Sequence, residues 1–386
     1  MTSAHSLPAW TYTDPEFLSL EGEIILKRTW QIVCHESELP NAGSYATLPF
    51  LNELIFVVRG KDGEIRAFHN VCRHRAARLL DDPTGECGGR IVCPYHAWTY
   101  DLEGQLIGVP GRELYPDLEQ GIMGLKPVAM GTCGGFVFVR PSREGGSFDE
   151  FIAPLRKEFE LYRTKDMKPF APVRLRTREV NWKVATDNYI DALHIPVAHP
   201  GLSGLANGTY DLDAQEGIYR FTADVARAAE GQTASVRAYS KFLPRVDHLP
   251  KDRQRKWVYA LMWPNLAFDI YPDQIDYMQF IPLSPTRTLL RETAYALPDD
   301  RREMKAARYL NWRVNRSVNI EDKDLIERVQ AGLGTSSFTS GPLGQNEVCL
   351  RDFANRMRNT ISLCANEERP HAEAYRTALE NCRGRT

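Results

Sequence analysis

The sequence has 386 residues, with 48 lysines and arginines against 50 aspartates and glutamates, and 43% of its residues are hydrophobic. This near-neutral balance argues against nucleic acid and anionic membranes as main partners, because both require a strong positive field. No apolar run approaches the roughly 18 to 20 residues of a membrane-spanning helix, and the N-terminus does not have the pattern of a signal peptide. We therefore expect a cytoplasmic protein with two domains, or with one large domain that carries an insertion.

The first 140 residues change from a helical to an extended pattern. Residues 21–35 place apolar side chains at helical spacing and predict a helix. From residue 43 to about residue 140, short strands alternate with turn signals. The pairs Asp62-Gly63 and Glu103-Gly104 predict β-hairpins over residues 53–71 and 97–110. This part of the chain is expected to form a small all-β unit.

The second half mixes helical and extended patterns. Helices are predicted over residues 147–162, 181–193, 301–330 and 347–363, and the second of these is broken near Pro196. Between residues 257 and 297, apolar and aromatic runs separated by Pro, Asn and Asp predict antiparallel strands. We therefore expect an α+β unit after the all-β unit, with a boundary near residues 141–150.

Two short segments each pair a cysteine with a histidine. Cys72 and His74 form the first pair, and Cys93 and His96 form the second. Structural zinc and a Rieske 2Fe-2S centre both use two cysteines and two histidines. Zinc fingers place cysteine with cysteine, whereas each half is mixed here, so that each half can serve both irons of a Rieske centre. The other six cysteines are expected to be buried or inert thiols rather than members of disulfides.

The residues around these pairs resemble a known family. CRHRAARL and CPYHAWTYDLEGQL look like the two cluster-binding loops of Rieske non-haem iron oxygenases, the ring-hydroxylating oxygenase α-subunit family. The segments RTWQIV, GSYATL and FHNVCRHR extend the likeness. Many members have Gly where this chain has Ala76 and Ala97. The resemblance implies that the four paired residues bind a Rieske cluster.

A second iron site is expected in the segment 181–199. Two histidines and one carboxylate are the usual ligands of a non-haem iron with open positions for O2. Asp191 and His194 are three residues apart and would share a helix face, while Pro196 would let His199 turn back to the same metal. The family motif, Asn-Trp-Lys followed by Asp-x-x-His-x4-His, is matched at Asn181, Trp182, Lys183, Asp191, His194 and His199.

By that resemblance, His194 and His199 are iron ligands, and Asn188 lies near the iron. Asp191 is not a ligand; it would bridge His194 to the cluster ligand His96 of a neighbouring subunit. The third ligand must be a carboxylate, and residues 319–330 resemble the family's Glu-Asp segment. We predict Asp322, with Glu321 and Asp324 as competitors, because a helix start is naturally rich in acidic residues.

The resemblance also implies a fold and a division into domains. We expect an α+β protein with an all-β Rieske domain and a catalytic domain whose antiparallel sheet is covered by helices, of the helix-grip, Bet v1-like kind. The expected spans are residues 1–42 for an N-terminal helical segment packed on the catalytic domain, 43–145 for the Rieske domain and 146–386 for the catalytic domain.

The expected function is that of a terminal oxygenase component, which uses O2 to hydroxylate or N-demethylate its substrate. Electrons would come from NAD(P)H through a separate flavin- or ferredoxin-type reductase, because this chain lacks a Gly-x-Gly-x-x-Gly turn after a strand. The resemblance implies a self-sufficient homotrimer or hexamer, in which each Rieske domain serves the iron of its neighbour.

The substrate is expected to be a small quaternary ammonium compound. The phrases IEDKDLIERVQAGL and SGPLGQNEVCLRDFANRMR resemble members that act on choline, betaine, carnitine or stachydrine. An aromatic cage could hold such a cation, and the candidate residues are Trp257, Tyr259, Trp263, Phe268, Tyr271, Tyr277 and Phe280. One alternative is an oxygenase of an aromatic acid or ring, which would need a basic residue in the pocket. Another is a Rieske electron-transfer protein without oxygenase activity.

Overall fold

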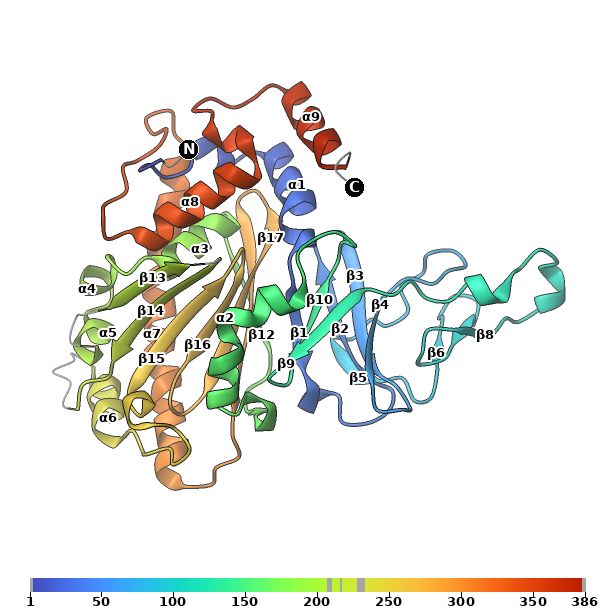
Figure 1. Cartoon of the computed structure of the whole chain (residues 1–386), viewed down its shortest axis with the longest axis horizontal. Coiled ribbons are helices and arrows are strands. Elements are labelled where there is room, and N and C mark those ends of the chain that lie inside the picture. Colours follow the sequence, from blue (N-terminus) through green and yellow to red (C-terminus); the bar gives the residue numbers. More distant parts are fainter. Residues whose placement is uncertain (1–2, 207–209, 216, 228–232, 384–386) are drawn as a thin grey trace. The chain divides into compact units, whose positions relative to one another are not determined.

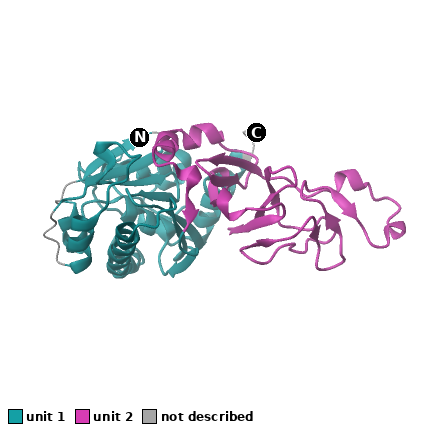
Figure 2. Ribbon diagram, turned by 90° about the horizontal axis from the view of Figure 1, so that it is seen from below, with its two compact units in different colours: residues 1–26, 170–386 teal, residues 27–169 magenta. Residues whose placement is uncertain are grey.

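The computed structural model describes residues 3–206, 210–215, 217–227 and 233–383. Its contacts divide the chain into two compact units (Figures 1 and 2). Unit 1 comprises residues 1–26 and 170–386, and unit 2 comprises residues 27–169. The chain therefore begins in unit 1, passes through unit 2 and returns, whereas the sequence suggested three consecutive spans. Residues 27–42 lie in unit 2 because the strand over residues 31–35 pairs inside that unit.

Unit 2 is built mainly from small antiparallel sheets. The first has the order β1-β10-β9, with β1 (Gln31–His35), β9 (Ala129–Cys133) and β10 (Phe136–Arg140). The second has the order β4-β3-β2-β5, with β2 (Ser44–Phe50), β3 (Glu53–Arg59), β4 (Ile65–His69) and β5 (Thr84–Glu86). The third has the order β6-β7-β8, with β6 (Ile91–Val92), β7 (Thr99–Tyr100) and β8 (Leu106–Gly108). The unit also contains α2 (Phe148–Leu161) and β11 (Lys168–Pro169).

Both predicted hairpins form in unit 2, but the helix predicted over residues 21–35 is wrong. Gly63 and Gly104 both have φ of 85°, which a glycine adopts without the strain that a side chain would cause. The helix α1 (Pro15–Ile24) ends before residue 25, and residues 31–35 form β1. Every residue of β1 is buried. A short segment that is buried on both faces suits a strand as well as a helix, and pairing with β10 decides in favour of the strand.

Unit 1 is built around a long antiparallel sheet. Its strand order is β13-β14-β15-β16-β17-β18, and β12 pairs with β18. The strands are β12 (Arg174–Arg178), β13 (Asp211–Gln215), β14 (Ile218–Asp224), β15 (Lys256–Met262), β16 (Leu266–Ile270), β17 (Ile275–Ser284) and β18 (Arg287–Ala296). The antiparallel strands predicted between residues 257 and 297 are thereby confirmed.

Helices cover this sheet, as the sequence predicted (Figure 1). The helices of unit 1 are α1, α3 (Trp182–Ile190), α4 (Ile195–Ala198), α5 (Pro200–Leu205), α6 (Ala234–Phe242), α7 (Arg302–Leu333), α8 (Val348–Thr360) and α9 (Ala372–Arg383). Unit 1 also has short 3-10 helices at Ala9–Tyr12, Lys251–Arg253 and Ser362–Ala365. Within the described ranges, none of the helices has the length and apolar character that crossing a membrane would need. All eight cysteines are free, so the even cysteine count does not reflect disulfides.

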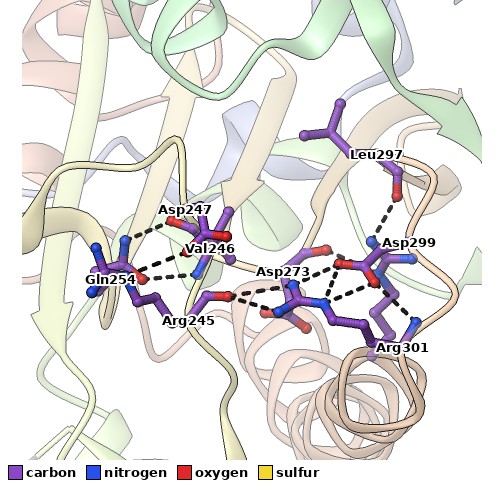
Figure 3. A network of polar contacts seen from close by, with 9 residues as sticks. Arg245, Val246, Asp247, Gln254, Asp273, Leu297, Asp299 and Arg301 are labelled. Carbon is purple, nitrogen blue, oxygen red and sulfur yellow. Dashed lines mark hydrogen bonds and ion pairs between the residues drawn. The ribbon is translucent and has the colours of Figure 1, made fainter.

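Arginine contacts fix the start of α7 (Figure 3). Arg301 precedes the helix and donates hydrogen bonds to the carboxylate of Asp299 at 2.7 to 3.0 Å. Two turns into the helix, Arg308 donates to the carbonyl oxygens of Asp273 and Leu297 at 3.1 and 2.8 Å. Charged hydrogen bonds of this kind are stronger than neutral ones. They hold the first turns of the long helix against the loops at the end of the sheet.

A buried ion pair ties the N-terminal segment to the start of α3. The ammonium group of Lys183 lies 2.7 Å from a carboxylate oxygen of Glu21, and both side chains are fully buried. Lys183 also donates to the carbonyl oxygen of Thr11 at 2.9 Å, and Trp182 donates to the second carboxylate oxygen at 3.0 Å. Removing one partner would leave a buried charge without compensation. The motif residues Trp182 and Lys183 therefore anchor α3 within unit 1.

Candidate metal centres

The two Cys-His segments of unit 2 fold as two loops with the same backbone pattern. In each loop the cysteine N–H donates to the carbonyl five residues later, at 2.8 Å for both Cys72 and Cys93. The cysteine carbonyl in turn accepts from the N–H four residues later, at 3.1 Å from Ala76 and 3.0 Å from Ala97. The two cysteines therefore take the same position in the two turns, whereas His74 follows its cysteine by two residues and His96 by three.

Each loop turns on an alanine with left-handed backbone. Ala76 has φ of 60° and Ala97 has φ of 55°. Residues with a side chain rarely adopt this conformation, whereas glycine does so without steric cost. This explains in physical terms why glycine is common at these two positions in the family that the sequence resembles.

The four predicted cluster residues come together at the tips of these loops. Cys72 and Cys93 are buried, and the rings of His74 and His96 have centroids 4.7 Å apart. The Nδ1 atoms of both histidines are buried, and neither has a hydrogen-bond partner among the described residues. Burial, followed by the neighbouring His96, lowers the pKa of His74, which favours the neutral imidazole that a metal needs.

The arrangement of these four residues suits a two-iron cluster better than a single zinc. Buried ring nitrogens normally have a partner, so the two unpaired Nδ1 atoms fit metal ligation. A tetrahedral zinc would hold its four ligand atoms within about 4 Å of one another. Among the described residues, the group of possible ligand atoms that lie within 4.8 Å of one another consists of His194, His199 and Asp322. The four residues in unit 2 do not form such a set.

In unit 1, a turn after α3 carries the first histidine of the second site. The helix ends at Ile190, and Asp191 follows with an extended backbone. One carboxylate oxygen of Asp191 accepts from the N–H of Leu193 at 2.8 Å, and the other lies 2.9 Å from Nδ1 of His194. The expected shared helix face is therefore wrong: a hydrogen-bonded turn makes this contact. Pro196 does not break α3 either, because it lies in the first turn of α4.

Asp322 joins the two histidines from α7. Its carboxylate oxygen lies 2.9 Å from Nε2 of His199 and 3.5 Å from Nε2 of His194. The possible ligand atoms of all three residues lie within 4.8 Å of one another. Asn188 on α3 also donates a hydrogen bond to Asp322. The geometry is thus that of two histidines and one carboxylate around one point.

The other two acidic candidates take different positions. One carboxylate oxygen of Glu321 lies 2.7 Å from Nδ1 of His199, and the other accepts a hydrogen bond from the hydroxyl of Ser317 at 3.1 Å. Asp324 is exposed. These residues lie in the middle of α7 rather than at a helix start, so the expected acidic helix start is wrong. Sequence reasoning missed that Glu321 orients an imidazole, which is a common arrangement around protein metals.

The charges around this site call for a cation. Burial acts to raise the pKa of Asp322, but hydrogen bonds from His194 and His199 outweigh it and hold that pKa well below its usual range. Burial acts to lower the pKa of His194, but its bonds to Asp191 and Asp322 raise it to about 9. Three carboxylates thus surround two imidazoles. Such a set of nitrogen and oxygen donors suits a divalent cation such as Fe(II).

A cavity of about 780 Å³ opens beside these residues, entirely within unit 1. His194, His199, Asp322 and Asn188 line it. Of the aromatic residues proposed for a cage, Tyr259, Tyr277 and Phe280 line the cavity, joined by Tyr189 and Phe221, which the sequence did not single out. Trp257, Trp263, Phe268 and Tyr271 lie outside the lining. The size is that of a site for a small organic molecule.

Comparisons with known proteins match a family to each of two parts of the chain. Residues 163–363 match the ring hydroxylating alpha subunit (catalytic domain) family, and residues 29–119 match the Rieske 2Fe-2S domain family. The chain is 39% identical over 198 residues to the glycine betaine monooxygenase oxygenase subunit of Chromohalobacter salexigens, which covers 51% of this chain and 44% of that protein. The chain spans about half the length of the curated relatives that it matches at 34% identity or more.

Solved structures share the fold over nearly the whole chain. A quaternary ammonium Rieske monooxygenase, whose structure concerns carnitine oxidation, has a TM-score of 0.79 at 23% identity over 92% of this chain and 95% of that chain. Naphthalene 1,2-dioxygenase with bound indole has a TM-score of 0.77 at 20% identity over 98% and 96%. The catalytic-domain match covers more than half of the sequence, and the chain therefore belongs to the family of Rieske-type ring-hydroxylating oxygenase α-subunits, whose two domains imply a 2Fe-2S Rieske cluster and a mononuclear iron.

Proposed function

We propose that this chain is the terminal oxygenase of a Rieske system that hydroxylates and N-demethylates a small quaternary ammonium compound. Electrons would come from NAD(P)H through a separate flavin- or ferredoxin-type reductase. When bound, the cluster supplies electron transfer and the iron supplies O2 activation. Cys72, His74, Cys93 and His96 would hold the cluster, and His194, His199 and Asp322 would hold the iron. The chain's remaining work is to bind and orient the substrate.

One observation carries the choice of substrate: two adjacent carboxylates line the cavity without a basic partner. Asp269 and Asp276 face each other across β16 and β17. Their hydrogen-bond partners in the described chain are neutral: Tyr189 and Tyr271 for Asp269, and Gln274 for Asp276. Burial raises the pKa of Asp269 to about 6 and that of Asp276 well above its usual value. Like charges opposite each other are unfavourable, and a bound cation would relieve this repulsion.

Aromatic faces continue the same wall. The register of β14 to β17 places Phe221, Tyr259, Asp269 and Asp276 in one cross-strand row. Phe221 and Tyr259 stack with centroids 4.4 Å apart, and the ring of Tyr189 lies 6.1 and 6.5 Å from them. A quaternary ammonium group has no N–H to donate, so aromatic faces and nearby carboxylates are the groups that can hold it. This wall supports an onium substrate over a neutral arene.

The proposed reaction is balanced without a further co-reactant. One O2, two electrons and two protons convert an N-methyl group to an N-hydroxymethyl group and release one water. The C–N bond of this carbinol then breaks to give a tertiary amine, formaldehyde and one proton. The role of the chain is to hold the ammonium group in the cavity so that one methyl group faces the point shared by His194, His199 and Asp322.

We also propose a homotrimer or hexamer in which the two metal sites of different subunits meet. Next to the iron ligand His194, Leu193 and Val197 are 45% and 87% exposed, and next to His96, Tyr95 is 57% exposed. Exposed apolar side chains beside both sites are consistent with a protein interface there. Asp191 would then link His194 to His96 of the partner subunit, since its carboxylate is only partly buried.

A single turnover tests the proposal. The purified protein is reduced without oxygen, mixed with glycine betaine, carnitine, choline or a simple aromatic acid, and exposed to O2, and the products are identified by mass. We expect formaldehyde and a demethylated amine from an onium compound. A hydroxylated ring and no demethylation would instead establish the aromatic alternative. If the cluster is reoxidised without product although each chain holds one mononuclear iron, none of the tested compounds is the substrate, and the proposed substrate is contradicted.

The aromatic-acid alternative has one observation in its favour. It requires a basic residue in the pocket, and Arg178 lines the cavity. An aromatic acid would leave the carboxylates Asp269 and Asp276 without a counter-charge, however, so we prefer the onium compound. The third candidate, a pure electron-transfer protein, has no use for the three-residue metal site or for the cavity beside it.

A further inference from the structure

Three arginines occupy alternate positions on β12 and line the cavity. They are Arg174, Arg176 and Arg178. Arg174 is exposed and its guanidinium lies 5.8 Å from the ring centroid of Trp312. Arg176 forms an ion pair with Glu292 on β18. Arg178, at the end of the strand, is only 8% exposed. The three arginines therefore differ in their exposure and in the groups that their guanidinium groups contact.

Arg178 is the buried arginine of the three, and among the described residues no ion pair compensates its charge. Among the described residues, its hydrogen bond is a single long one, 3.4 Å from Nη1 to the carbonyl oxygen of the preceding Thr177. A guanidinium has five N–H donors, so most of its donors remain unused. A buried charge without a partner is strongly unfavourable, and a partner supplied by a ligand would remove this penalty.

The carboxylates whose charge interacts with Arg178 already have partners of their own. They are Glu292, Glu327 and Asp322. Glu292 is bound by Arg176, Glu327 lies 3.3 Å from Lys323, and Asp322 contacts the two histidines of the metal site. None of them is within ion-pair distance of Arg178 in the described chain. Arg178 lines the same cavity as Asp322, so its unused donors are available to a ligand bound there.

We propose that Arg178 binds a carboxylate of the substrate, which makes the substrate an onium carboxylate rather than an onium alcohol. This inference rests on the function proposed above and narrows it. A guanidinium can hold a carboxylate by two parallel hydrogen bonds, which a hydroxyl group cannot match. A zwitterion uses both charged parts of the cavity, the carboxylates of the sheet wall and the guanidinium of β12. Neither a simple cation nor an aromatic acid does so.

Glycine betaine and choline provide a matched pair of ligands. Both carry a trimethylammonium group on a two-carbon skeleton, and they differ in ending with a carboxylate or a hydroxymethyl group. Their dissociation constants are measured by calorimetry on the oxidised holoenzyme, which does not turn over, for the wild type, Arg178→Gln and Arg178→Lys. Arg287→Gln is the control, because Arg287 is half exposed, pairs with Glu179 at 3.2 Å and lies outside the cavity lining.

We expect Arg178→Gln to weaken glycine betaine binding on the order of 10- to 100-fold, the loss of a charged hydrogen-bond pair, and to change choline binding less than about twofold. Arg178→Lys keeps the charge but loses the paired geometry. Its affinity for glycine betaine should therefore lie between those of the wild type and Arg178→Gln. Iron content and the cluster spectrum should stay unchanged. Arg287→Gln should bind both ligands as the wild type does.

Two outcomes of the binding and iron measurements would overturn the inference. One is equal weakening of betaine and choline binding in Arg178→Gln, which would indicate a structural role. The other is a loss of iron in Arg178→Gln while both Arg178→Gln and Arg178→Lys still bind glycine betaine in preference to choline. This would indicate that the guanidinium supports Asp322 and does not bind the substrate. Failure of the proposed function looks different: the wild type itself would bind and demethylate neither compound. Demethylation of both compounds with unchanged KM in Arg178→Gln would remove this inference alone.

Discussion

The two candidate metal sites are built in opposite ways. In unit 2, the four cluster residues lie within residues 72–96, on two loops that repeat the same backbone hydrogen bonds. In unit 1, Asp322 reaches His199 from 123 residues further along the chain, and the site forms only when α7 packs beside α3 and α4. A site made from local turns depends on local sequence, whereas a site made from distant helices depends on the packing of a whole unit.

The largest expected effect separates the two sites completely. His194→Ala should remove the mononuclear iron and lower turnover by more than about 100-fold, since changes to the residues around metal ligands already cost about 10- to 100-fold. The Rieske absorbance and the two cluster irons should remain. Cys93→Ser should remove the Rieske absorbance and the two cluster irons and leave the mononuclear iron in place. Iron counts and cluster spectra of both variants provide the measurement, and loss of both metals in either variant would show that the sites are not independent.

Next in size is the scaffold of unit 1. Lys183→Met should lower the free energy of unfolding by about 3 to 5 kcal/mol, because it leaves the buried Glu21 without its partner. Denaturant unfolding followed by fluorescence measures this, while the cluster absorbance reports on unit 2. The control is Lys323→Met, whose exposed pair with Glu327 should matter by less than about 1 kcal/mol. Equal effects of the two substitutions would contradict the anchoring role of Lys183.

The link between the sites should respond to Asp191→Asn. The carboxylate orients His194 through Nδ1 at 2.9 Å, and its loss should lower turnover about 10- to 100-fold while both metals stay bound. The rate at which the reduced cluster is reoxidised in the presence of substrate and O2 measures this directly. An unchanged reoxidation rate would mean that Asp191 neither orients the ligand nor carries the contact between subunits.

A smaller effect is expected from pH, through Asp269. Burial raises the pKa of Asp269 to about 6, against hydrogen bonds from Tyr189 and Tyr271 and with repulsion from Glu292. The carboxyl group is neutral below this value and ionised above it. Affinity for an onium cation should therefore rise on the order of tenfold between pH 5 and pH 7, and this rise should flatten in Asp269→Asn. The same raised pKa means that the stability of the fold falls as pH rises from about 4 to 6.

The smallest expected effect is a gain in unit 2. Ala76→Gly and Ala97→Gly should each raise the free energy of unfolding by about 0.5 to 1 kcal/mol, because glycine relieves the left-handed strain at these positions but loses more chain entropy. Thermal unfolding of the holoprotein gives the measurement. Ala77→Gly, one residue further in the same loop and without positive φ, should destabilise instead, and a gain there would refute the strain argument.

Several features could be predicted from the sequence because their signals are local. The two Cys-His pairs, the hairpins at Gly63 and Gly104 and the long helix over residues 301–330 all rest on spacings of a few residues. The strand over residues 31–35 was mistaken for a helix, because the helical spacing of apolar residues that starts in α1 continues into a short segment that is buried on both faces. Only its pairing with β10 distinguishes the two.

The metal site and the cavity show where local signals end. The sequence placed Asp191, His194 and His199 in one motif, but it left Glu321, Asp322 and Asp324 as competitors on one helix. Successive helix positions point about 100° apart, so the choice among them depends on the side of α7 that meets α3 and α4. The partners of Asp269 and Arg178 were equally beyond the sequence, because a charge is paired or unpaired only through residues that the fold brings to it.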